Sequence, residues 1–146
     1  MEKIVIEYGN YWTCENHDLL APIEEEGIEF LFNDGSRFYL KDGEHIDFEM
    51  RKATDAEYKD YYHKEGFLFK GDKVKIIKGK KIPIGTEKEI KDFHRYNVQG
   101  TYGHQYTDYV DFTDGTKTNI QNVRIPGLEN IDYVFEYKRL NVGGRL

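Results

Sequence analysis

The sequence is poor in the residues on which common enzyme and membrane classes depend. Among its 146 residues there is one cysteine, Cys14, and one serine, Ser36, which lies in a turn-forming stretch. A single cysteine excludes an internal disulfide and is typical of a reducing compartment. No apolar run approaches the ~20 residues that cross a bilayer, and the first residues, MEKIVIEYGNYW, show no signal-peptide pattern. We therefore expect a cytoplasmic protein that does not enter a membrane.

Candidate catalytic and metal-binding groups are also sparse. The sequence contains no P-loop and no dinucleotide-binding fingerprint. Cys14 lies three residues before His17, and His94 lies ten residues before His104, which does not provide the four clustered ligands of a zinc site. We therefore expect no catalytic residue, no metal and no cofactor. A small hydrolase or nucleotide-handling enzyme that uses histidines and aspartates of 93–111 is kept as a third hypothesis.

Positive charge is scarce overall but concentrated in one place. The formal net charge of −6 argues against a general polyanion binder. Residues 1–69 carry a net charge of −10, whereas residues 70–96 carry +5 and include the stretch KGDKVKIIKGKKIPIGT. Three interpretations of these lysines remain open: the solvated face of a strand, contact with a polyanion, or pairing with the acidic half or an acidic partner.

Most of the chain has the period-two alternation that is typical of strands. In the N-terminal half, Asp-Gly pairs in NDGS and KDGE favour tight hairpin turns between short strands, because glycine accepts a positive φ. This pattern predicts an antiparallel meander after a first strand at 3–8 and a long loop at 9–27. The strands predicted for the meander are 28–32, 37–40 and 45–50.

Two stretches resemble each other across the chain. FNDGSRFYL (32–40) and FTDGTKTNI (112–120) share an aromatic residue, Asp-Gly, a hydroxyl residue, a cation and a distal aliphatic residue. Any two hairpins with Asp-Gly turns share much of this pattern. The similarity therefore predicts two hairpins and carries little weight as a duplication.

One helix is predicted, over residues 53–66. Thr54 and Glu57 have the spacing of a capping box, and Gly66 is suited to end a helix. The helix separates the acidic region from the basic strip. It therefore marks the predicted domain boundary.

The region after the helix has the element order of a small barrel. GDKVKIIKGKKIPIGTEKEI opens with Gly-Asp, continues as an alternating strand and leads through a glycine-bearing basic loop into a second strand. YVDFTDGTKTNIQNVRI (109–125) indicates a closing hairpin followed by a short break at 119–123. Residues 71–125 therefore resemble an SH3-like barrel of the KOW and Tudor-like type. The residues that match this pattern are Gly71, Asp72, Val74, Ile76, Gly79, Gly85 and Ile90.

The resemblance implies a binding role. KOW modules bind RNA or transcription and translation machinery, and Tudor-like modules bind peptides through aromatic residues. Between the predicted second and third strands, residues 93–109 show no clear period. They are interpreted either as a long aromatic-rich loop that provides specificity or as a twisted hairpin that extends the barrel.

These observations predict a mainly β protein with an N-terminal antiparallel meander, one linking helix and a C-terminal SH3-like barrel. The predicted domains are an acidic antiparallel β region at 1–52, the linking helix at 53–66, the barrel at 67–127, and a C-terminal strand and tail at 128–146.

The predicted function is that of a non-enzymatic binding or adaptor protein. We expect a protein partner, with nucleic-acid-processing machinery as one class of it; direct nucleic-acid binding would be weak, and a homodimer through 131–140 remains open. The alternative is an acidic inhibitor that mimics nucleic acid through residues such as glutamates 24–26, as small phage or mobile-element accessory proteins do. The predicted contact residues are Lys78, Lys80, Lys81, Tyr96, Tyr102, His104 and Tyr106.

Overall fold

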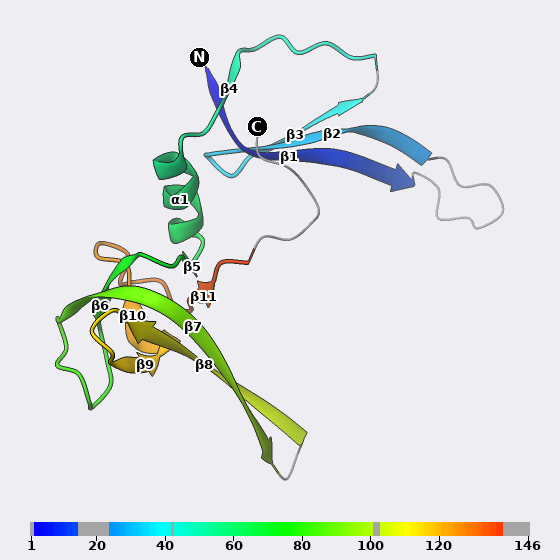
Figure 1. Cartoon of the computed structure of the whole chain (residues 1–146). Helices are drawn as coiled ribbons and strands as arrows, with labels where there is room; N and C mark the ends of the chain where they lie inside the picture. Colours follow the sequence, from blue (N-terminus) through cyan, green and yellow to red (C-terminus); the bar gives the residue numbers. More distant parts are fainter. Residues whose placement is uncertain (1, 15–23, 42, 101–102, 139–146) are drawn as a thin grey trace. The chain divides into compact units, whose positions relative to one another are not determined.

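The computed structural model describes residues 2–14, 24–41, 43–100 and 103–138. It is mainly β, with a single α-helix in the described part of the chain, which confirms the predicted fold class (Figure 1). The chain divides into two compact units. Unit 1 has its described residues within 1–61, and unit 2 spans 62–138. Each unit is described by itself.

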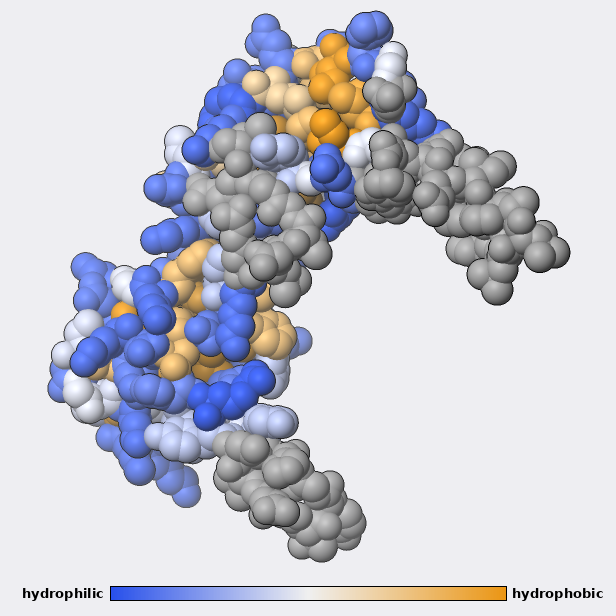
Figure 2. Space-filling view, turned by 45° about the vertical axis from the view of Figure 1, so that its right-hand side comes forward, coloured by the Kyte–Doolittle hydropathy of each residue, from blue (hydrophilic) through white to orange (hydrophobic). Residues whose placement is uncertain are grey.

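Unit 1 is built on a four-stranded sheet with the order β3-β2-β1-β4. β1, β2 and β3 are antiparallel neighbours, whereas β4 runs parallel to the start of β1. An aromatic cluster around Val5, Phe30 and Phe32 covers one face of the sheet. Figure 2 shows hydrophobic surface beside hydrophilic surface on the described part of the chain. The strands are β1 (Lys3–Cys14), β2 (Glu24–Phe32), β3 (Arg37–Lys41) and β4 (Met50–Lys52).

Two predictions for unit 1 are wrong in detail. The predicted loop at 9–27 is strand at both ends, since β1 continues to Cys14 and β2 begins at Glu24; residues 15–23 lie outside the described residues. The meander's third strand at 45–50 is absent over 45–49. There, Phe48 packs edge-on against Phe32 and Phe38, with ring centroids 5.8 and 5.2 Å apart. The alternation therefore reflects half-burial on the sheet face rather than strand pairing.

The predicted helix is present as α1 (Asp55–Lys64). The capping box forms: the Thr54 N–H donates to the Glu57 carboxylate, and the Glu57 N–H donates to the Thr54 hydroxyl. After the helix, Gly66 has a φ of +97° and donates its N–H to the His63 carbonyl. The division between the two units falls inside α1, between Tyr61 and Tyr62. The finer domain boundaries stay a prediction.

Unit 2 contains a five-stranded antiparallel sheet with the order β10-β6-β7-β8-β9. A single 3-10 turn, η1 (Ile120–Asn122), lies between β9 and β10. A parallel pair, β5 (Phe67–Leu68) and β11 (Phe135–Glu136), lies outside this sheet. The strands of the five-stranded sheet are β6 (Lys73–Ile76), β7 (Glu87–Gly100), β8 (Gly103–Phe112), β9 (Lys117–Asn119) and β10 (Val123–Arg124).

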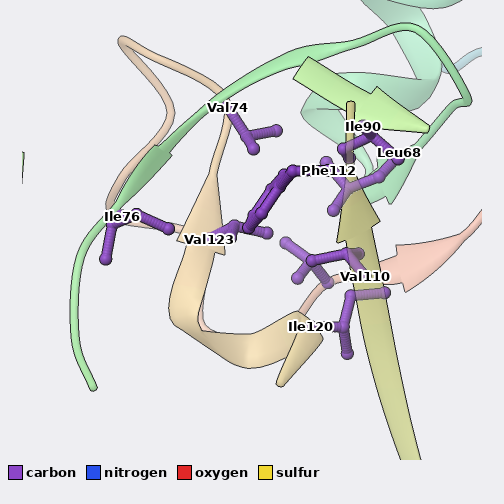
Figure 3. Packing of buried hydrophobic residues seen from close by; sticks show 9 residues of the cluster. Leu68, Val74, Ile76, Ile90, Val110, Phe112, Ile120 and Val123 are labelled. Atoms are coloured by element: carbon purple, nitrogen blue, oxygen red, sulfur yellow. The ribbon is translucent and has the colours of Figure 1, made fainter. Parts of the chain in front are cut away.

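The core of unit 2 is apolar, and its side chains come from β5 to β8, η1, β10 and the residue before β11. The alternation in β6 places Val74 and Ile76 inside, as expected for a strand with one wet face. They meet Phe112 of β8, which lies at the centre of the view in Figure 3. Nine buried residues form this cluster: Leu68, Val74, Ile76, Ile90, Val110, Phe112, Ile120, Val123 and Val134.

The segment 93–109 is a hairpin, so the interpretation as a long irregular loop is wrong. β7 and β8 pair from Ile90 and Phe112 outward to Gly100 and Gly103. β6 pairs only with the beginning of β7, and β9 only with the end of β8. Residues 92–108 therefore continue beyond the sheet as a two-stranded ribbon, and we call this segment the ribbon (Figure 1).

The segment after β10 is fixed by a buried arginine. Arg124 is 3% exposed, and its guanidinium donates to the carbonyls of Gln121, Val123, Ile131 and Asp132 at 2.7–3.0 Å. Burial lowers the pKa of Arg124 from its ordinary value. In the described part of the strand predicted at 131–140, only the two residues of β11 are strand. The Arg124 guanidinium instead joins the carbonyls of residues 131–132 to that of Gln121 in η1.

Candidate functional site

The stretch 77–86 between β6 and β7, here called the basic loop, is held at both ends. The Ile77 N–H donates to the Asn122 carbonyl and the Gly85 N–H donates to the Ile76 carbonyl, each at 2.8 Å. Within the loop, Ile82 packs against the core. Gly79, with a φ of +111°, lies so close to the Asn122 side chain that a Cβ would be 2.9 Å from it. The loop therefore has a defined conformation, set by its contacts with the end of β6 and with η1.

The three lysines of the basic loop are exposed. Lys78, Lys80 and Lys81 have no carboxylate partner among the residues that the structure describes. Other lysines of the basic strip do have partners: Lys75 lies 3.5 Å from Glu129, and Lys88 pairs with Asp114. Lys73 and Lys91 are exposed outside the loop, so the loop holds three of the lysines of the basic strip that have no carboxylate partner among the described residues.

The basic loop also carries an exposed aliphatic side chain. Ile84 is 67% exposed, and Pro83 beside it is also exposed. Ile84 lies in a tight turn, which the Thr86 hydroxyl and N–H close by donating to the Pro83 carbonyl at 2.7 and 3.2 Å. The sequence analysis placed Ile82 and Ile84 in the loop but did not select Ile84 as a contact residue, because nothing local distinguishes the two isoleucines. Only the loop conformation separates a packed Ile82 from an exposed Ile84.

The predicted aromatic residues lie on the ribbon where they are described. Tyr96 is 46% exposed on β7, and Tyr106 is 60% exposed on β8. The backbone of His104 belongs to β8, but its side chain, like the whole of Tyr102, lies outside what the structure describes. Tyr96 pairs with Thr107, and the next pair along the ladder contains Tyr106. Because successive pairs face opposite sides, Tyr96 and Tyr106 lie on opposite faces of the ribbon.

The face that carries Tyr96 is an aromatic and charged cluster. Tyr96 meets Tyr109 edge-on with ring centroids 5.2 Å apart, and the Lys117 ammonium lies 5.7 Å from the Tyr96 ring centroid. On the same face, His94 pairs with Asp111. The Lys117 ammonium is therefore already engaged with an aromatic ring of this face.

The opposite face is neutralised by its own ion pair. Arg95 donates from Nε to Asp108 at 2.8 Å, and its guanidinium carbon lies 5.3 Å from the Tyr106 ring centroid. The hydrogen bond to Asp108 raises the pKa of Arg95. Residues 92–111 contain three aspartates and one arginine, which gives a formal net charge of −2. The ribbon is thus an aromatic surface without the excess positive charge that phosphate binding requires.

The predicted contact residues do not form one continuous surface along β7. The basic loop ends where β7 begins, at Glu87, and Tyr96 is nine residues further along the strand. At ~3.3 Å per residue, this is about 30 Å of strand. The prediction that these residues contact a partner remains a prediction, and the structure divides them into a basic loop and a ribbon.

Two further groups in unit 2 were not among the predicted contact residues, although Asp72 was identified as part of the Gly-Asp pattern. Asp72 is buried, and its carboxylate accepts a hydrogen bond from the Phe69 N–H at 2.7 Å. The same carboxylate lies 2.8 Å from His63 Nε2. These contacts tie the end of α1 to the start of β6. Next to β5 and β11, exposed Tyr133 packs against Phe135 with ring centroids 4.8 Å apart. The alternation in IDYVFEY is the only signal that the sequence holds for this aromatic pair.

Metal and membrane features were sought over the described ranges. In these ranges no group of three or more His, Cys, Asp or Glu residues could hold a metal ion. No helix there has the length and apolar character needed to cross a membrane. Comparisons with protein-family models, with curated proteins and with solved structures find no match for the chain.

Proposed function

We propose that this chain is a non-enzymatic binding protein that engages a protein or nucleoprotein partner through the basic loop, with the ribbon as a second contact. The observation that carries the proposal is the chemistry of the basic loop. Lys78, Lys80 and Lys81 are exposed without carboxylate partners among the described residues, and the same ten-residue loop carries the exposed Ile84. A fixed loop with this composition gains binding energy without a large ordering cost.

We further propose that unit 2 is an SH3-like barrel of the KOW and Tudor-like type. The strand order β10-β6-β7-β8-β9 and the position of η1 before the last strand support this. Under this proposal the basic loop follows the first strand of the barrel. Loops carried by a rigid scaffold are common positions for binding residues.

The basic loop would act in two ways. Its lysines attract a negatively charged partner during encounter, an effect that salt weakens. Ile84 then loses solvent against an apolar group of the partner, and this burial slows dissociation. The ribbon adds tyrosine contact area, which is typical of protein interfaces.

The test is affinity capture from lysate with the full chain, with and without nuclease treatment. The variant carries Lys78→Gln, Lys80→Gln and Lys81→Gln, and the control carries Lys52→Gln, Lys73→Gln and Lys91→Gln, which remove the same charge from exposed positions outside the loop. We expect the loop variant to lose the captured partner and the control to retain it. Equal capture by both variants would contradict the proposal.

The same experiment separates the alternative of nucleic-acid mimicry. A mimic uses its acidic residues, so neutralising glutamates 24–26 would abolish capture while the loop variant would retain it. Loss of the partner on nuclease treatment would identify a nucleic-acid bridge instead of a direct protein contact.

A further inference from the structure

The basic loop combines two chemistries that a phosphate-binding loop does not need together. Three ammonium groups are exposed, and beside them Pro83 and the 67%-exposed Ile84 present apolar surface. Exposed aliphatic side chains on a rigid loop gain free energy only when a partner covers them with apolar atoms. A ligand that uses both chemistries of the loop therefore carries negative charge and an apolar group in one segment.

The charges around the loop disfavour a nucleic acid. Glu87 and Glu89 follow the loop directly on β7 and are exposed. Of the neighbouring lysines, Lys75 and Lys88 are already paired with carboxylates. Among the described residues the loop itself offers three unpaired cations, which release few counterions, and a continuous polyanion would also approach the exposed glutamates.

Aromatic stacking would not compensate for the small number of cations. Binding of single-stranded nucleic acid relies on rings that stack with bases next to the basic groove. The exposed tyrosines that the structure describes on β7 and β8 begin with Tyr96, about 30 Å of strand beyond the loop. An extended acidic segment of a protein needs no such rings, and it can alternate carboxylates with apolar side chains.

We propose that the basic loop binds an acidic protein segment in which carboxylates flank an apolar side chain. Ile84 contacts the apolar side chain, and Lys78, Lys80 and Lys81 pair with the carboxylates. The partner therefore binds through complementarity of charge and apolar surface at the same loop. This inference rests on the proposed function, which makes the basic loop the binding surface.

The experiment measures binding of the full chain to three fluorescent probes. They are a synthetic peptide that alternates glutamate and leucine, a polyglutamate peptide of equal charge, and a single-stranded RNA of equal charge. We expect the glutamate–leucine peptide to bind about tenfold more tightly than either purely anionic probe, because partial burial of one aliphatic side chain is worth about that factor.

Two variants separate the two chemistries. Ile84→Ser is expected to weaken binding of the glutamate–leucine peptide about tenfold and to leave polyglutamate unaffected. The loop variant with Lys78→Gln, Lys80→Gln and Lys81→Gln is expected to lose both peptides, while the control with Lys52→Gln, Lys73→Gln and Lys91→Gln keeps them. Circular dichroism and the thermal midpoint confirm that each variant is folded.

The inference is overturned if RNA binds more tightly than the glutamate–leucine peptide, if Ile84→Ser leaves peptide binding unchanged, or if no peptide binds. These outcomes are distinct from failure of the proposed function. If the lysine substitutions abolish capture from lysate but RNA is the preferred probe, the loop is the binding surface and only the partner class is wrong. If capture does not depend on the lysines, the proposed function itself fails.

Discussion

Unit 1 and unit 2 contain the same three-stranded element in different surroundings. In unit 1 it is β1-β2-β3, and in unit 2 it is β7-β8-β9. The turn before the third strand is the same in both. The carboxylate of Asp34 accepts hydrogen bonds from the N–H and hydroxyl of Ser36, and Asp114 accepts the same two bonds from Thr116.

The strand that precedes the turn also matches. The pairing of β1 with β2 shifts register between Val5 and Glu7, and the pairing of β7 with β8 shifts between Ile90 and Asp92. In each case the residue before the turn aspartate donates its N–H to the first strand: Asn33 to the Ile4 carbonyl and Thr113 to the Glu89 carbonyl, both at 3.0 Å. The two elements therefore agree in register as well as in turn geometry.

Even a side-chain contact is repeated. The Lys3 ammonium lies 5.5 Å from the ring centroid of Phe32, and the Lys88 ammonium lies 5.7 Å from that of Phe112. Each phenylalanine is the last residue of the middle strand. The similarity between FNDGSRFYL and FTDGTKTNI is therefore a similarity of three-dimensional structure, although it carried little weight as sequence.

The two elements differ in what lies beside their first strand. β7 pairs with the antiparallel strand β6, and β6 pairs in turn with β10. The unit that contains these strands encloses a cluster of nine buried residues. β1 is flanked only by three residues of the parallel β4. The corresponding cluster of unit 1 has three buried residues among those described, with partly exposed side chains around them. One hairpin motif thus supports two cores of different completeness, because closure comes from strands outside the motif.

The largest effect is expected from truncating the equivalent phenylalanines. Phe112→Ala removes a side chain that is 1% exposed at the centre of the larger cluster, so it should cost about 4 kcal/mol. Phe32→Ala should cost less, because its partly exposed neighbours can move into the space. Urea unfolding of both variants measures this. Equal losses would show that the two cores are equally complete.

A smaller and matched effect is expected at the two turn glycines. Gly35 and Gly115 have φ values of +86° and +87°, and a Cβ at either position would meet no atom within 4 Å. Each Gly→Ala substitution should therefore cost about 1 kcal/mol through backbone strain alone. Gly→Asn at the same positions is the control and should cost less, since asparagine tolerates this conformation. Thermal unfolding that gives clearly different losses for Gly35→Ala and Gly115→Ala would break the equivalence of the turns.

The smallest effect is a loss of stability in unit 1 at acid pH. Arg51 binds Glu57 through two hydrogen bonds of 2.7 and 2.9 Å, and these together with the Thr54 N–H lower the pKa of Glu57 to about 2. A depressed carboxyl pKa stabilises the fold above the unfolded-state pKa near 4.5 and loses this stabilisation as the pH falls toward 2. The hydrogen-exchange protection of amides in α1 and β4, corrected for the pH dependence of intrinsic exchange, should fall over this range in the wild type.

The control for this prediction is Glu57→Gln, which has no carboxyl group to titrate. Its hydrogen-exchange protection in α1 should be lower than that of the wild type at neutral pH and should change less between pH 4.5 and 2. A wild type and variant with the same pH dependence would show that the Arg51–Glu57 pair does not stabilise unit 1.

Local signals in the sequence predicted the local structure of both units. The capping box of Thr54 and Glu57, the Asp-Gly turns and the alternation in β6 all depend on neighbours within a few residues, and each is present. The prediction of a third strand in the meander was wrong because the alternation at Ile46 and Phe48 indicates half-burial but does not specify a strand with which they pair. Pairing is decided by segments far along the chain.

The candidate site divides in the same way. The sequence by itself determined that Lys78, Lys80 and Lys81 lie in a glycine-bearing loop after an alternating strand, because glycine positions and period-two patterns act locally. Only the tertiary structure decided that these lysines lack partners among the described residues while Lys75 and Lys88 have them, and that Ile84 points to solvent while Ile82 packs inside. The physical reason is that charge pairing and burial depend on atoms brought together by long-range strand pairing, which no short stretch of sequence specifies.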